Sequence, residues 1–357
     1  MFKPQSFHLQ WHITERCNLN CKHCYFDKKF LKNELSLTQV FNIFNDYIKL
    51  LKKWKLSRER AMISITGGEP LIRADLLKFL KKCHQNRKKT RYGILTNGIL
   101  LNDKKIAELK KFEIDYVQVS LEGMEKRNDE VRGKGTFEKI VKAVNLLIKN
   151  GINTVVSVTV TKQNLKDVSS LIELSKGLKV NALGLRRFIP IGRGKQMREL
   201  MLSPQETKDL YLYVLKMRQK LKDSKSKLAL IIGCEDGILA QEGYRVNGCV
   251  AGYSSLTILP NGDVYPCRRL PIYVGNVLKQ SLEEIFYKST KLEELRNHFN
   301  IDIRCQNCHY FSKCMGGAKC VSYGYWQGPN VNNPQFLPDP QCWGLFKDIH
   351  NAKRRQT

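Results

Sequence analysis

Acidic residues are scarce in this chain of 357 residues: 33 Asp and Glu stand against 61 Lys and Arg, and the formal net charge is +28. Such an excess is compatible with a lysine-rich, solvated surface. It also leaves open an acidic partner, such as a leader peptide, a nucleic acid or an anionic cofactor precursor. The lysines within residues 50–56 follow a helical pattern and resemble a solvated face, which speaks against a nucleic-acid groove.

Long apolar runs are also missing. No run approaches the length of a membrane span, and residues 1–10 lack the charged segment and apolar core of a secretory signal. We therefore expect a soluble, cytoplasmic protein with no membrane partner. In that compartment, 12 cysteines are more typical of metal binding than of disulfides.

Short apolar strands alternate with amphipathic helices in the N-terminal part of the chain, with no internal repeat or low-complexity linker. Alternation of this kind predicts a parallel sheet with right-handed crossovers. Six units are too few for a closed eight-stranded barrel, so the expected fold class is α/β, a partial (β/α)6 TIM-like barrel. Strands are expected at residues 9–13, 62–66, 92–96, 116–120, 154–160 and 182–188, and helices at 37–54, 74–85, 104–111, 137–149, 165–175 and 204–221.

Three cysteines, Cys17, Cys21 and Cys24, follow the first expected strand in a C-x3-C-x2-C loop. A four-iron cluster takes four ligands, so three local thiolates leave one iron open to a group that is not protein. A structural zinc site is normally closed by four ligands, and a disulfide would leave one cysteine over. His23 lies between two of the cysteines, where its ring would point away from a shared metal. The spacing therefore favours an iron–sulfur cluster.

Polar residues follow the next strands, where a parallel barrel gathers its chemistry. The second strand leads into Gly67, Gly68, Glu69 and Pro70, which offers flexible backbone and a carboxylate suited to an ammonium group. Each later signal is an ordinary turn by itself, but together they predict a ligand site beside the cysteine loop. These later signals are Asn97, Ser120, Glu122 and Arg132.

The cysteine loop and residues 67–70 together resemble the radical S-adenosylmethionine (SAM) enzymes, over about residues 8 to 195. The resemblance implies that SAM chelates the open iron of a 4Fe–4S cluster. It also implies that one electron cleaves the sulfonium and that the deoxyadenosyl radical abstracts hydrogen from substrate. By the same likeness residues 67–70 hold the methionine amino group, and His23 borders the adenine. Asn97 lies among these signals, and Ser120, Glu122 and Arg132 match ribose or carboxylate contacts more loosely.

A second cysteine-rich region follows residue 230, and a hairpin turning at Asn261 and Gly262 is expected inside it. Setting aside the first loop and Cys83, a helix residue expected to be half-buried with no ligand role, leaves eight cysteines, enough for two four-iron clusters or for two zinc ribbons. The eight are Cys234, Cys249, Cys267, Cys305, Cys308, Cys314, Cys320 and Cys342.

This region resembles the SPASM extension of peptide- and protein-modifying radical SAM enzymes. The likeness assigns Cys249, Cys267 and Cys320 to an inner auxiliary 4Fe–4S cluster. It assigns Cys305, Cys308, Cys314 and Cys342 to an outer one.

Three departures from the SPASM pattern matter. Cys320 follows Cys314 after five residues rather than three, and no cysteine lies between Cys249 and Cys267, so Cys234 is the candidate fourth inner ligand. Where sulfatase-maturing relatives carry an Asp base, Arg268 and Arg269 follow Cys267. Because an arginine cannot accept a proton at working pH, that oxidation is disfavoured.

The prediction is an oxidoreductase or peptide maturase, working anaerobically, that cross-links or oxidises a side chain of a peptide or small protein. Its expected partners are that substrate and a reductant such as ferredoxin or flavodoxin. A separate protein that recognises the peptide is a further partner compatible with the sequence. The expected domains are a barrel at 1–200, a connecting helix at 201–230 and a SPASM domain at 231–357. Alternatives are a haem-pathway tetrapyrrole enzyme and a non-catalytic metal protein that binds nucleic acid.

Overall fold

A computed structural model describes residues 2–26, 34–233, 236–246 and 248–345. Its centre is a single ten-stranded sheet in the order β10-β9-β8-β1-β2-β3-β4-β5-β6-β7. The pairs from β8 through β1 to β7 are all parallel, and β9 and β10 are added antiparallel at one edge. The strands are β1 Phe7–His12, β2 Ala61–Thr66, β3 Arg91–Thr96, β4 Tyr116–Ser120, β5 Thr154–Val160, β6 Ala182–Arg187, β7 Ala229–Ile232, β8 Ser255–Ile258, β9 Asp263–Tyr265 and β10 Gly275–Asn276.

The α/β prediction is confirmed, and all six expected strands are present. Two further parallel strands extend the sheet beyond them. β7 has only four residues, too few for a clear period in the sequence, yet it pairs with β6. β8 was expected as one arm of the hairpin, and its parallel pairing with β1 depends on contacts between residues 8–11 and 255–258. The sheet therefore crosses the expected boundaries at residues 200 and 230, and the domain division stays a prediction.

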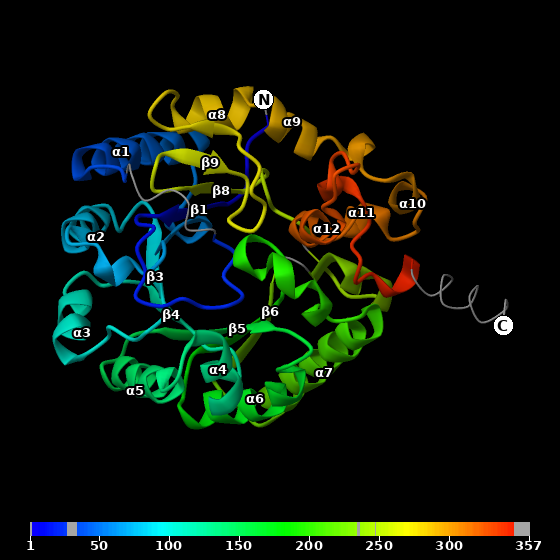
Figure 1. The fold of residues 1–357 in the computed structure, drawn as a ribbon. Coiled ribbons are helices and arrows are strands. Elements are labelled where there is room, and N and C mark those ends of the chain that lie inside the picture. The colour runs from blue at the N-terminus through cyan, green and yellow to red at the C-terminus, as the bar shows by residue number, and fades with distance from the viewer. Residues whose placement is uncertain (1, 27–33, 234–235, 247, 346–357) are drawn as a thin grey trace.

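Helices lie around the outside of the curved sheet. The helices α1 to α3 and α5 to α7 form an arc, α8 lies beyond α1 and the hairpin, and α9 to α12 continue from α8 toward the C-terminus (Figure 1). The helices are α1 Leu37–Trp54, α2 Leu76–Gln85, α3 Asp103–Lys110, α4 Glu125–Arg132, α5 Thr136–Lys149, α6 Val168–Gly177, α7 Pro204–Asp223, α8 Leu282–Lys288, α9 Thr290–Arg296, α10 Ile303–Gln306, α11 Phe311–Cys314 and α12 Lys319–Trp326. Short 3-10 turns are η1 Arg58–Arg60, η2 Pro70–Ile72, η3 Leu165–Asp167, η4 Gly192–Leu200, η5 Asp236–Glu242, η6 His298–Asn300 and η7 Pro334–Phe336. No described helix has the length and apolar character needed to cross a membrane.

Local sequence explains where the long helices begin. Ser36 caps α1 in a reciprocal capping box with Gln39, and Ser203 and Glu206 do the same for α7, whose first residue is Pro204. The helix α4 was not expected, because its sequence EKRNDEVR has no apolar stripe. It buries Asn128 and Arg132 instead.

The main core lies between the sheet and the helices. Phe7 packs edge-on against Trp54 at 4.9 Å between ring centroids, and Trp11 packs against Phe79 at 5.1 Å. The alternate positions of the strands point to the inside of the barrel, where barrels usually stack apolar side chains. Here the wall is polar: His8 Nε2 lies 2.6 Å from Ser64 Oγ, which lies 2.6 Å from Tyr116 Oη.

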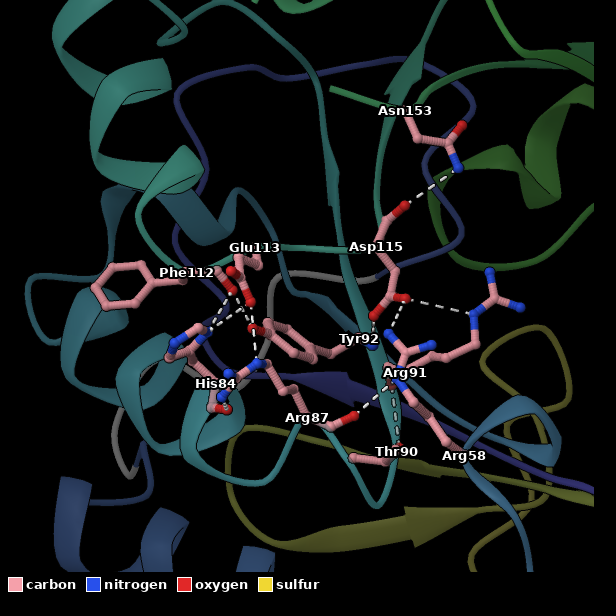
Figure 2. A network of polar contacts seen from close by, with 10 residues as sticks. All are labelled: Arg58, His84, Arg87, Thr90, Arg91, Tyr92, Phe112, Glu113, Asp115 and Asn153. Carbon is pink, nitrogen blue, oxygen red and sulfur yellow. Dashed lines mark hydrogen bonds and ion pairs between the residues drawn. The ribbon is translucent and has the colours of Figure 1, made fainter. Parts of the chain in front are cut away.

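A network around Asp115 joins the amino ends of the strands, opposite the cysteine loop (Figure 2). Asp115 accepts hydrogen bonds from Arg58 Nη2 at 2.5 Å and from the backbone of Tyr92 at 2.9 Å. Arg91 lies 3.6 Å away as a second cation, and Asn153 donates to the Asp115 backbone carbonyl at 3.1 Å. These contacts tie β2, β3, β4 and β5 together at the end of the barrel that carries no candidate site residue.

The C-terminal region is joined to the barrel by a buried ion pair. Arg187, at the end of β6, donates from both terminal nitrogens to the two oxygens of Asp339, at 3.0 and 2.8 Å, and both side chains are 1% exposed. Asp339 also accepts from the backbone of Ala318 at 3.2 Å. A bidentate pair of this kind fixes the orientation of both partners.

Candidate active site

The loop of residues 13–26 is held at the carboxyl end of the sheet by backbone hydrogen bonds to three other segments. Thr14 and Arg16 accept from Gly68 and Glu69, both at 2.8 Å. The backbone N–H of Lys22 donates to the carbonyl of Val131 in α4, and the backbone N–H of Arg193 in η4 donates to the carbonyl of Cys24. These anchors fix a segment that has no regular secondary structure of its own.

The three thiols of the loop share one cavity, and two of them, Cys17 and Cys21, accept weak hydrogen bonds. Leu19 N–H lies 3.5 Å from Cys17 Sγ, Asn97 Nδ2 lies 3.9 Å from the same sulfur, and Arg132 Nη1 lies 3.8 Å from Cys21 Sγ. Burial raises the pKa of the Cys17 and Cys21 thiols, because it penalises the charged form. A metal's positive charge would be needed to hold them as thiolates at neutral pH.

Gly67 and Gly68 contact the cysteine loop, whereas the sequence suggested only an approach to a ligand. A Cβ at Gly68 would lie 2.3 Å from the Arg16 carbonyl oxygen and 2.5 Å from that of Glu15. A Cβ at Gly67 would lie 2.4 Å from the Thr14 carbonyl oxygen, and Gly67 has a φ of +159°. The pair is therefore required for the loop to lie against the end of β2, and both glycines also line the cavity.

Glu69 is fully buried and bonded on both carboxylate oxygens. Its Oε1 accepts from Thr96 Oγ1 at 2.8 Å and from the backbone of Leu71 at 3.1 Å, and its Oε2 accepts from the backbone of Asn97 at 2.8 Å. Burial raises the pKa of Glu69 to about 7 in spite of these donors. The carboxylate thus joins the ends of β2 and β3, and neither Glu69 nor Pro70 lines the cavity.

Glu122 and Arg132 form a buried ion pair beside Cys21, and His23 lies against it. Glu122 Oε1 accepts from Arg132 Nη2 at 2.5 Å and lies 3.2 Å from His23 Nε2, while its Oε2 accepts from the backbone of Thr159 at 2.8 Å. Burial alone would raise the pKa of Glu122, but the charges of His23 and Arg132 outweigh it and hold the pKa at about 2. Glu122 is therefore ionised at any working pH.

One cavity of about 190 Å³ brings most of the expected residues together. The site residues predicted from the sequence that line this cavity are Cys17, Cys21, Cys24, His23, Gly67, Gly68, Asn97, Ser120, Glu122 and Arg132. Sequence reasoning missed the strand residues Gln118, Ser157, Thr159, Arg186 and Arg187, which line the same cavity. Most of them occupy alternate, inward-facing strand positions, a period-2 signal that the apolar character of these strands hid.

The C-terminal cysteines gather in two sets. Cys249, Cys267 and Cys320 line one small, apolar cavity, and Cys305, Cys308, Cys314 and Cys342 line another, each of about 20 Å³. Gln241 donates to Cys342 Sγ at 3.1 Å. These sets match the expected inner and outer groups, and the role of each residue stays a prediction. Cys234 lies outside the described residues.

Every described cysteine is a free thiol, including Cys83, which is fully buried in α2 and not half-buried as expected. Within the described residues, no three Cys, His, Asp or Glu side chains are close enough together to hold one metal ion.

The residues around the main cavity fit a bound 4Fe–4S cluster and SAM. Three thiols supply soft ligands, the type that iron–sulfur clusters take. Two buried polar atoms of cavity residues, Arg132 Nε and His23 Nδ1, have no hydrogen-bond partner in the described part of the chain. Such atoms normally have a partner, and a polar ligand would supply one.

Comparisons with known proteins agree with this geometry. A family model described as the radical SAM superfamily matches residues 11–175, and the SPASM model, an iron–sulfur cluster-binding domain, matches residues 249–309. The chain belongs to the radical SAM superfamily, in its SPASM subgroup. It is therefore a radical SAM enzyme, and its cofactors are 4Fe–4S clusters and SAM.

Two curated relatives span most of the chain. The AdoMet-dependent heme synthase of Methanosarcina barkeri is 26% identical over 330 residues, which cover 86% of this chain and 90% of the relative. The mycofactocin maturase MftC of Mycolicibacterium smegmatis is 28% identical over 347 residues, which cover 94% and 83%.

Solved radical SAM structures share the fold. Streptococcus suis SuiB bound to S-adenosylmethionine aligns with a TM-score of 0.75 at 19% identity, covering 95% of this chain and 77% of SuiB. The structure of anSMEcpe with AdoMet and a peptide aligns with a TM-score of 0.74 at 18% identity, covering 98% and 97%. At these identities the likeness concerns the fold alone.

Proposed function

We propose that this enzyme modifies a peptide or small protein, by cross-linking or oxidation of a side chain. The observation that carries the proposal is the single cavity that the three cysteines of the loop share with the polar inner wall of the sheet. A radical made at the loop would meet a substrate held against that wall. In support, the relative MftC is named a maturase, and SuiB has been solved with a precursor peptide.

Cys17, Cys21 and Cys24 would hold the 4Fe–4S cluster. When bound, the cluster and SAM supply a deoxyadenosyl radical that abstracts a hydrogen atom from the substrate. The chain's own residues orient and shield the reactants. The SAM contacts are assigned to His23, Gly67, Gly68, Glu69, Pro70, Asn97, Ser120, Glu122 and Arg132. Among these, the bonds of Glu69 to β3 give it a framework role as well.

Two auxiliary 4Fe–4S clusters would complete the enzyme. Cys249, Cys267 and Cys320 are assigned to the inner one, with Cys234 as the fourth ligand. Cys305, Cys308, Cys314 and Cys342 are assigned to the outer one, which lies beyond the Arg187–Asp339 pair. A ferredoxin or flavodoxin would supply the electron, and a separate recognition protein would present the peptide.

A second candidate function is tetrapyrrole modification. It is favoured by the heme synthase relative and by the Fe-coproporphyrin III synthase of Methanosarcina barkeri, 31% identical over 60% of this chain. The same cavity and the same radical chemistry would serve it, so only the substrate separates the two candidates.

The first prediction tests the function with SAM, dithionite and anaerobically reconstituted enzyme. Peptides encoded beside its gene and a tetracarboxylate porphyrin are offered separately, and mass spectrometry reads the product. We expect a mass change in a peptide, together with released 5′-deoxyadenosine, and neither with Cys17→Ala. Cys83→Ala is the matched control, because Cys83 lies in the core away from the cavities. A mass change confined to the porphyrin would replace the proposal with the second candidate.

A further inference from the structure

The inner wall of the barrel carries cations that the radical chemistry does not use. Arg186 reaches the interior from β6 and Arg268 from the loop after β9, and both line the cavity that holds the cysteine loop. The Arg186 side chain passes over Gly184, with its Nε and Nη2 atoms 3.7 Å from the place a Cβ would occupy there, an ordinary contact distance.

Arg268 is bonded to a neutral group. Its Nη1 donates to Gln10 Oε1 at 2.6 Å, and its guanidinium lies 6.0 Å from the centre of the Tyr25 ring. An amide oxygen and an aromatic ring orient a guanidinium without neutralising its charge. Arg268 is thereby held in place and keeps its positive charge inside the cavity.

The carboxylates around the cavity do not balance its cations. The lining includes Arg132, Arg186, Arg187, Arg193, Arg268 and Arg269 but, among acidic residues, only Glu15 and Glu122 of the described chain. The Glu122 carboxylate already contacts Arg132 and His23. The Arg187 side chain is paired with Asp339, which does not line the cavity. The lining therefore carries more arginines than carboxylates.

Neutral polar side chains that do not themselves line the cavity lie near these cations. His8, Ser64 and Tyr116 form the chain of 2.6 Å contacts described above, and the absence of a side chain at Gly93 makes space for the Tyr116 ring, which lies where a Cβ would otherwise clash. The positive charges of Arg268 and Arg186 both act on His8, whose pKa burial and these charges lower to about 4. The imidazole is therefore neutral at working pH and adds no further cation.

We propose that this inner wall, with Arg268 and Arg186 as its charged members, binds a carboxylate of the substrate. A guanidinium matches the planar, bidentate geometry of a carboxylate, and a hydroxyl such as that of Ser157 or Thr159, which line the same cavity, can complete its hydrogen bonds. The inference rests on the proposed function, because it assigns the substrate of the same cavity. Both candidate substrates can carry the group, as an acidic side chain or C-terminus of a peptide, or as a side chain of a tetrapyrrole.

The second prediction is tested by equilibrium binding to the reconstituted holoenzyme with SAM and no reductant. The probes are a random-sequence pentapeptide mixture, a tetracarboxylate porphyrin, and the methyl esters of each. We expect one acid probe to bind at least tenfold more tightly than its ester. Arg268→Gln should weaken that acid by about ten- to a hundredfold, the effect of one charge-assisted hydrogen bond, while leaving the ester unchanged. Which acid binds identifies the source of the carboxylate.

Two variants control the result. Arg60→Gln removes the same charge from an exposed position before β2, at the other end of the barrel, and should bind every probe as the wild type does. Arg268→Lys keeps the positive charge but lacks the planar guanidinium that can form two hydrogen bonds to a carboxylate, and it should give an intermediate loss of affinity for the acid probe. Should Arg268→Gln fail to fold by circular dichroism, Arg186→Gln takes its place.

The proposal is overturned by equal binding of acid and ester, by equal losses in Arg268→Gln and Arg60→Gln, or by binding of neither acid. Its failure is separable from failure of the proposed function. Release of 5′-deoxyadenosine and the mass change of a peptide are measured with reductant and do not depend on the ester comparison.

Discussion

At the scale of single residues, Glu69 acts on the framework as well as beside the cofactor site. Three donors, from η2 and from the end of β3, meet its two oxygens, and the side chain is fully buried. Its pKa of about 7 means that the folded protein holds a proton that the unfolded chain releases near pH 4.5. Raising the pH between these values therefore favours the unfolded state.

The third prediction concerns this pH dependence in the metal-free protein. Wild type should lose stability relative to Glu69→Gln as the pH rises from about 4.5 to about 7, by up to about 3 kcal/mol over the shift. Urea unfolding of both proteins at pH 5 and pH 7.5 measures it. Hydrogen bonds lost in the variant shift its free energy of unfolding by the same amount at every pH. The comparison is therefore between the changes in unfolding free energy with pH in the two proteins. Parallel pH profiles would show that the pKa of Glu69 is not raised.

At the scale of elements, the cysteine loop takes its conformation from the segment after β2. Residues 14–16 and 67–69 lie so close that no side chain fits at Gly67 or Gly68. The loop has no helix or strand bonds of its own within residues 13–26. The first metal site therefore depends on this contact for its geometry.

A fourth prediction follows for Gly68→Ala. The added methyl would meet the backbone oxygens of Arg16 and Glu15 at 2.3 and 2.5 Å, and backbone cannot give way as a flexible side chain does. We expect the loop to shift, and the protein to lose the first cluster and SAM cleavage while keeping its circular dichroism spectrum. Gly177→Ala, in open space at the end of α6, should keep both iron and activity. Full iron loading of Gly68→Ala would mean that the loop tolerates the shift.

At the scale of the whole molecule, the C-terminal region is part of the barrel's own sheet. β8 pairs with β1, and the buried Arg187–Asp339 pair joins the end of β6 to the loop before Cys342. Removing one partner of such a pair costs about 3–5 kcal/mol, because it leaves a buried charge. The two C-terminal cysteine sets are thus held in a fixed place relative to the main cavity.

The fifth prediction is the metal content of anaerobically reconstituted protein. Three four-iron clusters require about twelve irons per chain, with little zinc, measured by elemental analysis. Cys267→Ala should lower the count by about four irons, and Cys83→Ala should not change it. Iron near four with zinc near two per chain would instead identify the C-terminal region as a zinc module.

The sequence by itself determined the chemistry and most of the elements. Cysteine spacing at 17, 21 and 24 and the grouping of the later cysteines are local or composition signals. The six central strands are short segments rich in apolar residues, which local sequence also reveals. Tertiary structure decided the rest. The pairing of β7 and β8 and the burial of the polar helix α4 arise from contacts between distant residues, which no local period records. The same holds for Gly68, which looked like a ligand turn and is needed against residues 14–16, and for Arg186, whose side chain faces the cavity only because β6 lies where the sheet curves around it.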